Sequence, residues 1–442
     1  MAKLLITILG KGQQELKLKD YKEANYFLND RKNNKTTPFV GEAIVGLMPQ
    51  TETFDTIYIL GTNDSMWHTL YDHCSWKMNR VEEEVEQKFQ QIYKEIKERK
   101  VTQDTLQMVA QAFRELIGIE TKCQIIDIGR TEEELWRVFE IIANIPNKKD
   151  IVSIDITHGL RYQPLFLFLA LSYFKNIKSI TIKDVFYGGI ELQQDFKENG
   201  KELAPIFNLK PMVDILAWVD AATIFHRYGD ISLFTQLLKE QKISEQFIKE
   251  AESYATILQL NDVARVRAAS TKFINQLEKI STEGKVKPLE FTKELMREFP
   301  EKINTKTTDW QFMLLMAERY YNTKQITMCI MVLYEAIISR VAKIYKDANY
   351  RIDESSIEGY SQCSRIAKDI TVTAIYNEVN GLQHFPTKVK ELADIRNSLA
   401  HVRENTQVSK GEIPNKFGEL YRYFKEKIKN NKLEELPNHR VI

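Results

Sequence analysis

The sequence predicts an α/β domain with a doubly wound, Rossmann-like sheet, followed by an all-α region. Two observations carry this prediction. Roughly the first 200 residues alternate short apolar strand patterns with helical patterns, which is typical of a parallel sheet covered by helices. From about Asn208 only helical patterns remain, and Pro205 and Pro211 flank the change. The predicted parts are an α/β domain at 1–208, a helical connector at 209–301 and a C-terminal helical bundle at 302–442.

Short runs of β-branched and other apolar residues predict the strands of the sheet. The expected strands are Lys3–Leu9, Thr56–Leu60, Cys123–Ile128, Ile151–Ile156 and Ser179–Phe186. Longer segments with helical periodicity separate them and predict the helices Arg80–Lys100, Thr105–Ile117, Glu132–Ile145 and Leu160–Phe174. Because helices connect successive strands, we expect the strands to run parallel.

The rest of the chain is predicted to be helical. The connector helices are expected at Val213–Phe225, Ser232–Glu240, Glu245–Leu260, Val263–Leu277 and Pro288–Phe299, with Pro300 marking the end of the connector. The bundle helices are expected at Trp310–Tyr321, Gln325–Tyr345, Ser361–Leu382 (interrupted), Lys388–Val402 and Ile413–Asn430. Because the second of these is apolar nearly all round, it should be the central helix of the bundle.

The composition excludes several classes of protein. The 442 residues carry 62 Lys+Arg and 61 Asp+Glu, a net charge of +1, so a nucleic acid would have to be bound at a local site. The four cysteines form no CxxC pair, which argues against a structural zinc site and a disulfide framework. No apolar run reaches the roughly 18 residues of a membrane span. We therefore expect a cytoplasmic protein with no membrane partner and with no metal or other cofactor.

Three predicted strands end in small, polar, glycine-containing loops. In a doubly wound sheet, ligands bind beyond the carboxyl ends of the strands, at the point where the strand order reverses. Such loops suit phosphates and bases, and the helix after the third loop could bind an anion at its N-terminus. Ordinary turn chemistry is the alternative for each loop. The candidate ligand-binding residues are Gly10, Lys11, Gly12 and Gln13; Gly61, Thr62, Asn63 and Ser65; and Thr157, His158 and Gly159.

The third loop contains a histidine with two possible roles. His158 either hydrogen-bonds a backbone carbonyl or contacts a bound ligand. Asp155 lies inside the preceding apolar run, so we expect a buried, hydrogen-bonded carboxylate there. The first loop, GKGQQE, lacks the third glycine of GxGxxG, and the chain contains no GxxxxGK[ST]. A dinucleotide cofactor of the usual kind is therefore not expected.

The stretch Glu391–His401 holds an arginine and a histidine with four residues between them, Arg396 and His401, and Asn397 follows the arginine. A histidine can transfer protons near neutral pH, and an arginine can stabilise charge on a phosphate. On a regular helix, residues five apart diverge by roughly 140°. Either the helix begins irregularly near Arg396, or a second copy across a two-fold axis completes the site. A surface arginine and an unrelated histidine are the alternative reading.

Three segments resemble the CARF domains of CRISPR-associated proteins. They are ILGKGQ at 8–13, ILGTNDSMW at 59–67 and DITHGLRYQP at 155–164. The order of the whole chain, with a C-terminal helical bundle that contains RNSLAH at 396–401, resembles the CARF–HEPN ribonucleases of type III CRISPR systems. The connector at 209–301 resembles no domain that we can name.

The resemblance implies a role in antiviral defence. In that family the CARF domain binds a cyclic oligoadenylate, which activates a HEPN endoribonuclease whose paired Arg-x4-6-His motifs form one composite dimer site. The resemblance assigns the catalytic roles to Arg396, Asn397 and His401 and the ligand contacts to the three loops. The expected partners are a homodimer or higher even oligomer, single-stranded RNA and cyclic oligoadenylate, with cyclic tetra-adenylate favoured over cyclic hexa-adenylate.

The expected chemistry needs no metal. His401 would act as general base or acid while the RNA 2′-OH attacks its own phosphodiester, leaving a 2′,3′-cyclic phosphate and a 5′-OH. Arg396 would stabilise the non-bridging oxygens, Asn397 would orient His401 or the phosphate, and DNA would be inert. Two alternatives stay open. One is a ligand-sensing regulator whose helical part binds DNA or a protein, and the other is a ring nuclease that degrades cyclic oligoadenylate around Asn63 and His158.

Overall fold

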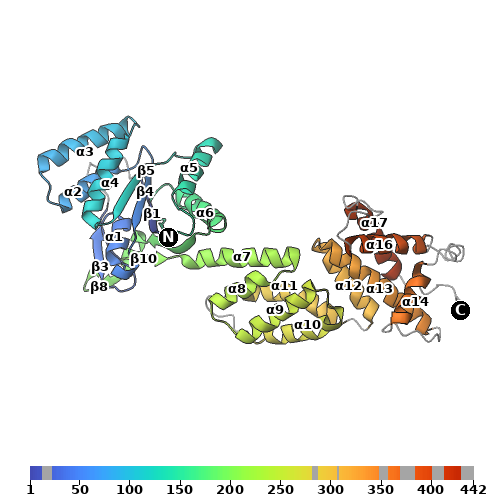
Figure 1. Ribbon diagram of the computed structural model, residues 1–442. Coiled ribbons are helices and arrows are strands. Elements are labelled where there is room, and N and C mark those ends of the chain that lie inside the picture. Colours follow the sequence, from blue (N-terminus) through green and yellow to red (C-terminus); the bar gives the residue numbers. More distant parts are fainter. Residues whose placement is uncertain are drawn as a thin grey trace. The chain divides into compact units, whose positions relative to one another are not determined.

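The computed structural model describes residues 1–11, 22–280, 287–305, 308–347, 357–368, 384–400 and 413–429. The chain divides into two compact units, Met1–Asp214 and Ile215–Ile442. The first is an α/β unit, and the described part of the second is helical (Figure 1), so the predicted fold class is confirmed. Within the ranges given above, no helix combines the length and the apolar character that crossing a membrane requires.

The first unit contains an eight-stranded, mostly parallel sheet with the order β3-β2-β10-β7-β6-β1-β4-β5. The strands from β7 to β5 run parallel to one another, whereas β10 is antiparallel to β7 and β3 is antiparallel to β2. The strands are β1 Lys3–Leu9, β2 Ala24–Phe27, β3 Asn34–Thr37, β4 Thr56–Gly61, β5 Glu120–Ile125, β6 Ile151–Asp155, β7 Thr181–Gly188 and β10 Ala204–Asn208. A separate hairpin pairs β8 Lys197–Glu198 with β9 Lys201–Glu202.

Helices cover both faces of this sheet, each face with its own apolar core. Along β1, Leu5 belongs to one core and Ile6 to the other, because successive side chains of a strand point to opposite faces. One face is covered by α1 Val40–Leu47, α2 Trp67–Lys77, α3 Glu82–Lys97 and α4 Gln103–Ile117, and the other by α5 Glu132–Asn144 and α6 Tyr162–Ile177 (Figure 1). This is the doubly wound arrangement that the alternating pattern predicts.

The sequence pattern does not predict β2, β3, β10, α1 or α2. β2, β3, β10 and α1 are eight residues long or shorter, and β10 contains Pro205, which the sequence prediction takes as a boundary instead. The expected strand Cys123–Ile128 is also misplaced, because β5 runs from Glu120 to Ile125. β5 is an edge strand that buries alternate side chains, Thr121 and Cys123, so its extent does not coincide with an apolar run.

The described helices of the second unit pack around one hydrophobic core, whose residues extend from Trp218 to Phe424 in the sequence. Within it, α13 packs against α12, α14, α16 and α17, which confirms its predicted central position. The helices, the first of which starts in the first unit, are α7 Lys210–Tyr228, α8 Ser232–Glu240, α9 Glu245–Gln259, α10 Val263–Leu277, α11 Lys287–Asn304, α12 Asp309–Asn322, α13 Ile326–Asp347, α14 Ile357–Lys368, α16 Phe385–Ala400 and α17 Ile413–Lys429.

Pro300 does not end its helix, contrary to the sequence prediction. α11 continues through Pro300 to Asn304. A proline inside a helix removes one backbone hydrogen bond. Here Phe299, Pro300 and Ile303 are all buried, and burial of apolar surface stabilises the continued helix.

Candidate functional site

The strand order of the sheet reverses at β1. β4 and β6 flank β1 and run parallel to it, with β5 beyond β4 and β7 beyond β6. The three predicted loops therefore follow adjacent strands at the carboxyl edge, where doubly wound sheets bind ligands. Gly10 and Lys11 follow β1, whereas Gly12 and Gln13 lie outside the described residues.

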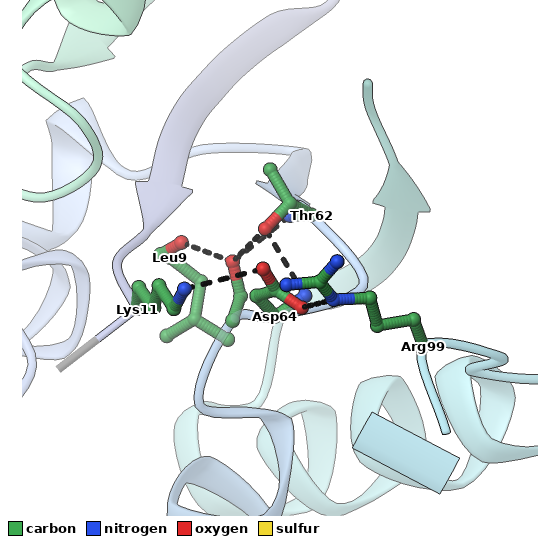
Figure 2. A network of polar contacts seen from close by, with 6 residues as sticks. Leu9, Lys11, Thr62, Asp64 and Arg99 are labelled. Carbon is green, nitrogen blue, oxygen red and sulfur yellow. Dashed lines mark hydrogen bonds and ion pairs between the residues drawn. The ribbon is translucent and has the colours of Figure 1, made fainter. Parts of the chain in front are cut away.

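Hydrogen bonds join the loop after β4 to the end of β1 (Figure 2). Ser65 Oγ accepts the N–H of Thr62 at 2.9 Å and donates to the carbonyl of Leu9 at 2.7 Å. The N–H of Met66 donates to the carbonyl of Gly10 at 3.0 Å. Because Thr62 and Ser65 are buried, these bonds fix the loop by contacts within the protein itself.

A cluster of charged side chains surrounds Asp64 (Figure 2). Lys11 Nζ lies 3.3 Å from one carboxylate oxygen of Asp64, and Arg99 Nε lies 3.0 Å from the other. The carboxylate is 7% exposed, whereas the side chains of Lys11 and Arg99 are 35% and 59% exposed. Two cations share one carboxylate, so the cluster carries a net charge of +1. The exposed cations can therefore contact an anion at this edge of the sheet.

The other polar residues of this loop take part in its own structure. The N–H of Val101 donates to Asn63 Oδ1 at 3.0 Å, and Trp67 Nε1 donates to the carbonyl of Thr62 at 2.9 Å. A Cβ on Gly61 would lie 2.5 Å from Trp67 Cζ2, so only glycine fits at this position. Turn chemistry thus accounts for the carbonyl of Thr62 and the side-chain oxygen of Asn63. Within the described residues no hydrogen bond uses the amide nitrogen of Asn63, which leaves that donor for a ligand.

Asp155 fixes the loop after β6. Its carboxylate accepts hydrogen bonds from the hydroxyl of Thr7 at 2.8 Å and from the N–H and the hydroxyl of Thr157 at 3.0 and 2.5 Å. The Thr157 hydroxyl in turn accepts the N–H of Gly188 at 2.8 Å. Asp155 is fully buried, so the predicted buried, hydrogen-bonded carboxylate is confirmed.

His158 and Gly159 complete this loop. Gly159 has a φ of +104°, and a Cβ there would lie 2.8 Å from Ile8 Cγ2, so glycine is required for both conformation and space. Burial lowers the pKa of His158, although the nearby Asp155 carboxylate opposes this shift. His158 is therefore neutral at pH 7 and can act both as a donor and as an acceptor.

The helix after the third loop begins later than predicted. α6 starts at Tyr162 rather than Leu160. The N–H of Leu160 donates to the side-chain oxygen of Gln163 at 3.0 Å. Because Gln163 already accepts the N–H of Leu160, this N–H is not available to an anion at the predicted N-terminus of the helix.

Arg396 lies well inside α16, which begins at Phe385. The predicted alternative of an irregular helix start near Arg396 is therefore wrong. Its guanidinium lies 4.4 Å from the ring centroid of Tyr334, and Nη1 lies 3.6 Å from a carboxylate oxygen of Glu335. The side chain of Arg396 is 31% exposed, Asn397 is exposed, and His401 lies outside the described residues.

Comparisons with known proteins bear on the first unit and on the first part of the second. A family model described as "CRISPR system endoribonuclease Csx1, CARF domain" matches residues 4–191. A second model, described as "CRISPR-associated protein MJ1674, second domain", matches residues 214–307. Residues 4–191 are thus similar to a Csx1-type CARF domain, and residues 214–307 are similar to the second domain of MJ1674.

Two similar proteins extend this comparison. The CRISPR-associated protein MJ1674 of Methanocaldococcus jannaschii is 22% identical over 418 residues, which are 91% of this chain. This chain spans 62% of the length of that curated relative. A structure described as Enterococcus italicus Csm6 bound to cyclic hexa-2'-fluoro-hexa-dAMP covers 100% of this chain and 96% of its own, at 11% identity and a TM-score of 0.36. At that TM-score the likeness carries no argument.

Sequence reasoning missed two charged residues of the first unit, Asp64 and Arg99. Asp64 lies inside the predicted loop 61–65, but its burial between two cations could not be read from a loop pattern. Arg99 follows the end of α3 and has a φ of +55°. No motif marks Arg99, because it reaches Asp64 from a segment 35 residues away in the sequence.

Proposed function

We propose that this chain is a cyclic-oligoadenylate-activated, metal-independent endoribonuclease of type III CRISPR defence. The CARF domain is the sensor, and the C-terminal bundle with Arg396 and His401 is the nuclease. The observation that carries the proposal is the set of three loops at adjacent strand ends of a CARF domain, beside the cluster of Lys11, Asp64 and Arg99 with its net charge of +1. The family description, which names an endoribonuclease, supports it.

Cyclic oligoadenylate suits the chemistry of these loops. Its phosphates would contact the exposed cations Lys11 and Arg99, which Asp64 holds in place. The amide nitrogen of Asn63 and the neutral ring of His158 offer hydrogen bonds to a base or a ribose. We expect cyclic tetra-adenylate rather than cyclic hexa-adenylate, a preference that rests on the family resemblance alone.

A symmetric ring favours a site shared by two copies of the chain. α6 begins beside the third loop and carries an apolar stripe whose side chains are 39–60% exposed. A spacing of three or four residues puts the stripe on one face of the helix, and an exposed apolar surface of this kind marks an interaction site. A second copy packed against it would bring two sets of loops together. The stripe consists of Tyr162, Leu165, Leu169, Tyr173 and Ile177.

The nuclease chemistry follows from the residue types in and beside α16. His401 takes or gives the proton while the RNA 2′-OH attacks its own 3′ phosphate, and the bond to the 5′-oxygen breaks. Arg396 stabilises the charge on the phosphate oxygens, and Asn397 orients His401 or the phosphate. Because Arg396 and His401 diverge on a regular helix, the second chain supplies the complementary half of the site.

Incubation of the full-length protein with labelled RNA, with and without cyclic tetra- or hexa-adenylate, tests the proposal. We expect cleavage of single-stranded RNA with activator only, persistence of cleavage in EDTA, ends with a 2′,3′-cyclic phosphate, and no cleavage of DNA. Activity that vanishes in EDTA or survives in His401→Ala would contradict the mechanism.

A mixed dimer tests the composite site. With one His401→Ala chain, we expect activity well below half that of the wild type, because each site needs both chains. The activator should act mainly on kcat by aligning the two halves. Half activity in the mixed dimer would mean that each chain holds an independent site.

Neutral His158 in the third loop favours a second activity, degradation of the activator by the CARF domain itself. Incubation of the protein with cyclic tetra-adenylate and chromatography of the products would test it. We expect slow ring opening that is lost in His158→Ala. An intact ring after prolonged incubation would leave the CARF domain a sensor only.

A further inference from the structure

A cavity of about 370 Å³ lies in the second unit where α7 and α11 meet α12. Small-molecule sites typically measure about 300–1,000 Å³. α7 and α11 belong largely to the MJ1674-like second domain, whereas α12 follows that domain in the sequence. The lining residues combine an apolar wall with charged and polar groups; they are Phe225, His226, Leu295, Glu298, Phe299, Lys302, Leu315, Glu318, Arg319, Asn322 and Thr323.

The guanidinium of Arg319 is held in this cavity by aromatic rings. Its central carbon lies 4.2 Å from the ring centroid of Phe299 and 5.9 Å from that of Phe225. Gly229, with a φ of +69°, brings its backbone so close that a Cβ there would clash with the Arg319 guanidinium. Aromatic rings and the backbone of Gly229 thus position the arginine, and the positive φ of Gly229 favours glycine at this close approach.

The carboxylates of the cavity already have cationic partners. Glu298 pairs with Lys302 at 2.6 Å, and Glu318 pairs with Lys425 at 2.6 Å. Among the residues that the structure describes, no carboxylate lies within ion-pair distance of Arg319. Besides the hydrogen bond from Lys302, Arg319 also helps to lower the pKa of Glu298, but Glu298, Glu318, Lys302, Lys425 and Arg319 together still carry a net charge of +1.

We propose that this cavity is a binding site for a phosphate group, with Arg319 as its main ligand. Stacking on phenyl rings occupies the faces of a guanidinium and leaves its N–H edge for the paired oxygens of a phosphate. Asn322 and Lys302 line the same cavity and supply further donors. The phosphate belongs either to the backbone of an RNA strand or to a free nucleotide, since the chemistry of recognition is the same.

This site goes beyond the proposed nuclease centre, and its test does not depend on cleavage. We would measure binding of the full-length protein to a fluorescein-labelled oligo-U with 2′-O-methyl groups, which lacks the attacking hydroxyl, by anisotropy at several salt concentrations. AMP binding would be measured by calorimetry. The variants are Arg319→Met, which keeps the stacked length but loses the charge, and Asn322→Asp, which leaves Arg319 in place and adds a negative charge. Arg265→Met, at an exposed arginine paired with Asp262, is the matched control.

If the phosphate belongs to RNA, Arg319→Met should weaken oligo-U binding about tenfold and reduce the slope of log K against log salt by about 0.7. Asn322→Asp should also weaken oligo-U binding, and Arg265→Met should leave oligo-U binding unchanged. If the phosphate belongs to a free nucleotide, the same variants should lose AMP binding while oligo-U binding stays unchanged. The proposal is overturned if the wild type binds neither probe, if both variants bind like the wild type, or if oligo-U binding weakens with an unchanged salt slope.

Discussion

The carboxyl edge of the sheet in the first unit and the surroundings of Arg396 differ in how they hold their charged groups. At the sheet edge, a 7% exposed carboxylate of Asp64 anchors Lys11 and Arg99, and buried hydrogen bonds from Ser65 fix the loop beside them. Arg396 instead lies on the surface of α16, with a 3.6 Å ion pair and a stacking contact. The charged cluster at the sheet edge is held by contacts within one chain, whereas the proposed nuclease centre is a partly exposed half-site that would be completed by a second copy.

The largest expected effect tests the exposed half-site. Arg396→Ala should lower activated RNA cleavage by about 100- to 1,000-fold, the usual cost of losing a group that stabilises transition-state charge. Because Arg396 is partly exposed, the fold and the dimer should persist, as measured by circular dichroism and sedimentation. Arg422→Ala, at an exposed arginine on α17, is the control and should retain activity. Equal losses in both variants would remove any special role of Arg396.

Acidification should lower the free energy of unfolding of the first unit, which contains the charged cluster at the sheet edge, through protonation of His68. This residue of α2 is buried against Phe89 and Tyr93 of α3, and burial, assisted by Lys97, lowers its pKa from 6.5 to about 4. Between these values the unfolded chain binds a proton that the folded chain does not, so stability falls as the pH falls. The loss should reach about 3 kcal/mol at most.

Urea unfolding of the full-length protein, followed by hydrogen exchange of β1 and β4 peptides from pH 7 to pH 4, would measure this loss. His68→Phe removes the titrating group and should flatten the pH dependence in this window. An unchanged pH dependence in His68→Phe would assign the acid sensitivity to other groups.

Gly61→Ala should test whether the loop after β4 is as rigid as its contacts imply. The added Cβ would lie 2.5 Å from Trp67 and 3.1 Å from Ser65, and overpacking of this kind costs about 1–3 kcal/mol. Gly418→Ala is the matched control, because its nearest side-chain atom is 3.9 Å away. Faster exchange of β4 amides in the first variant alone would support a rigid site, and wild-type exchange in both would mean that the loop yields freely.

The smallest expected effect concerns Arg99, the more exposed cation of the cluster. Arg99→Ala should weaken cyclic-oligoadenylate binding about two- to fivefold, the range for a partly exposed charge pair. Arg114→Ala, at an exposed arginine paired with Glu120, should leave binding unchanged. Calorimetry at two salt concentrations would measure both. A salt-independent affinity in the wild type would argue that the cluster takes no part in binding.

The sequence alone determined the elements whose apolar pattern is long and regular. β1, α8 and α10 have the bounds that their periodicity predicts. In a buried strand or an amphipathic helix, the spacing of apolar residues along the sequence follows directly from which side chains are buried. Asp155 was likewise predictable, since a carboxylate inside an apolar run must be hydrogen-bonded. The position of the three polar loops at strand ends also followed from local pattern.

Only the tertiary structure decided what depends on residues distant in the sequence. The ion pair between Arg99 and Asp64 joins the end of α3 to a strand loop, and the cavity at Arg319 forms where three helices from separate segments meet. The continuation of α11 through Pro300 was decided by the burial of Phe299 and Ile303 in the core of the second unit. In each case the stabilising free energy comes from contacts between segments that are distant in the sequence, and a local sequence pattern cannot predict such contacts.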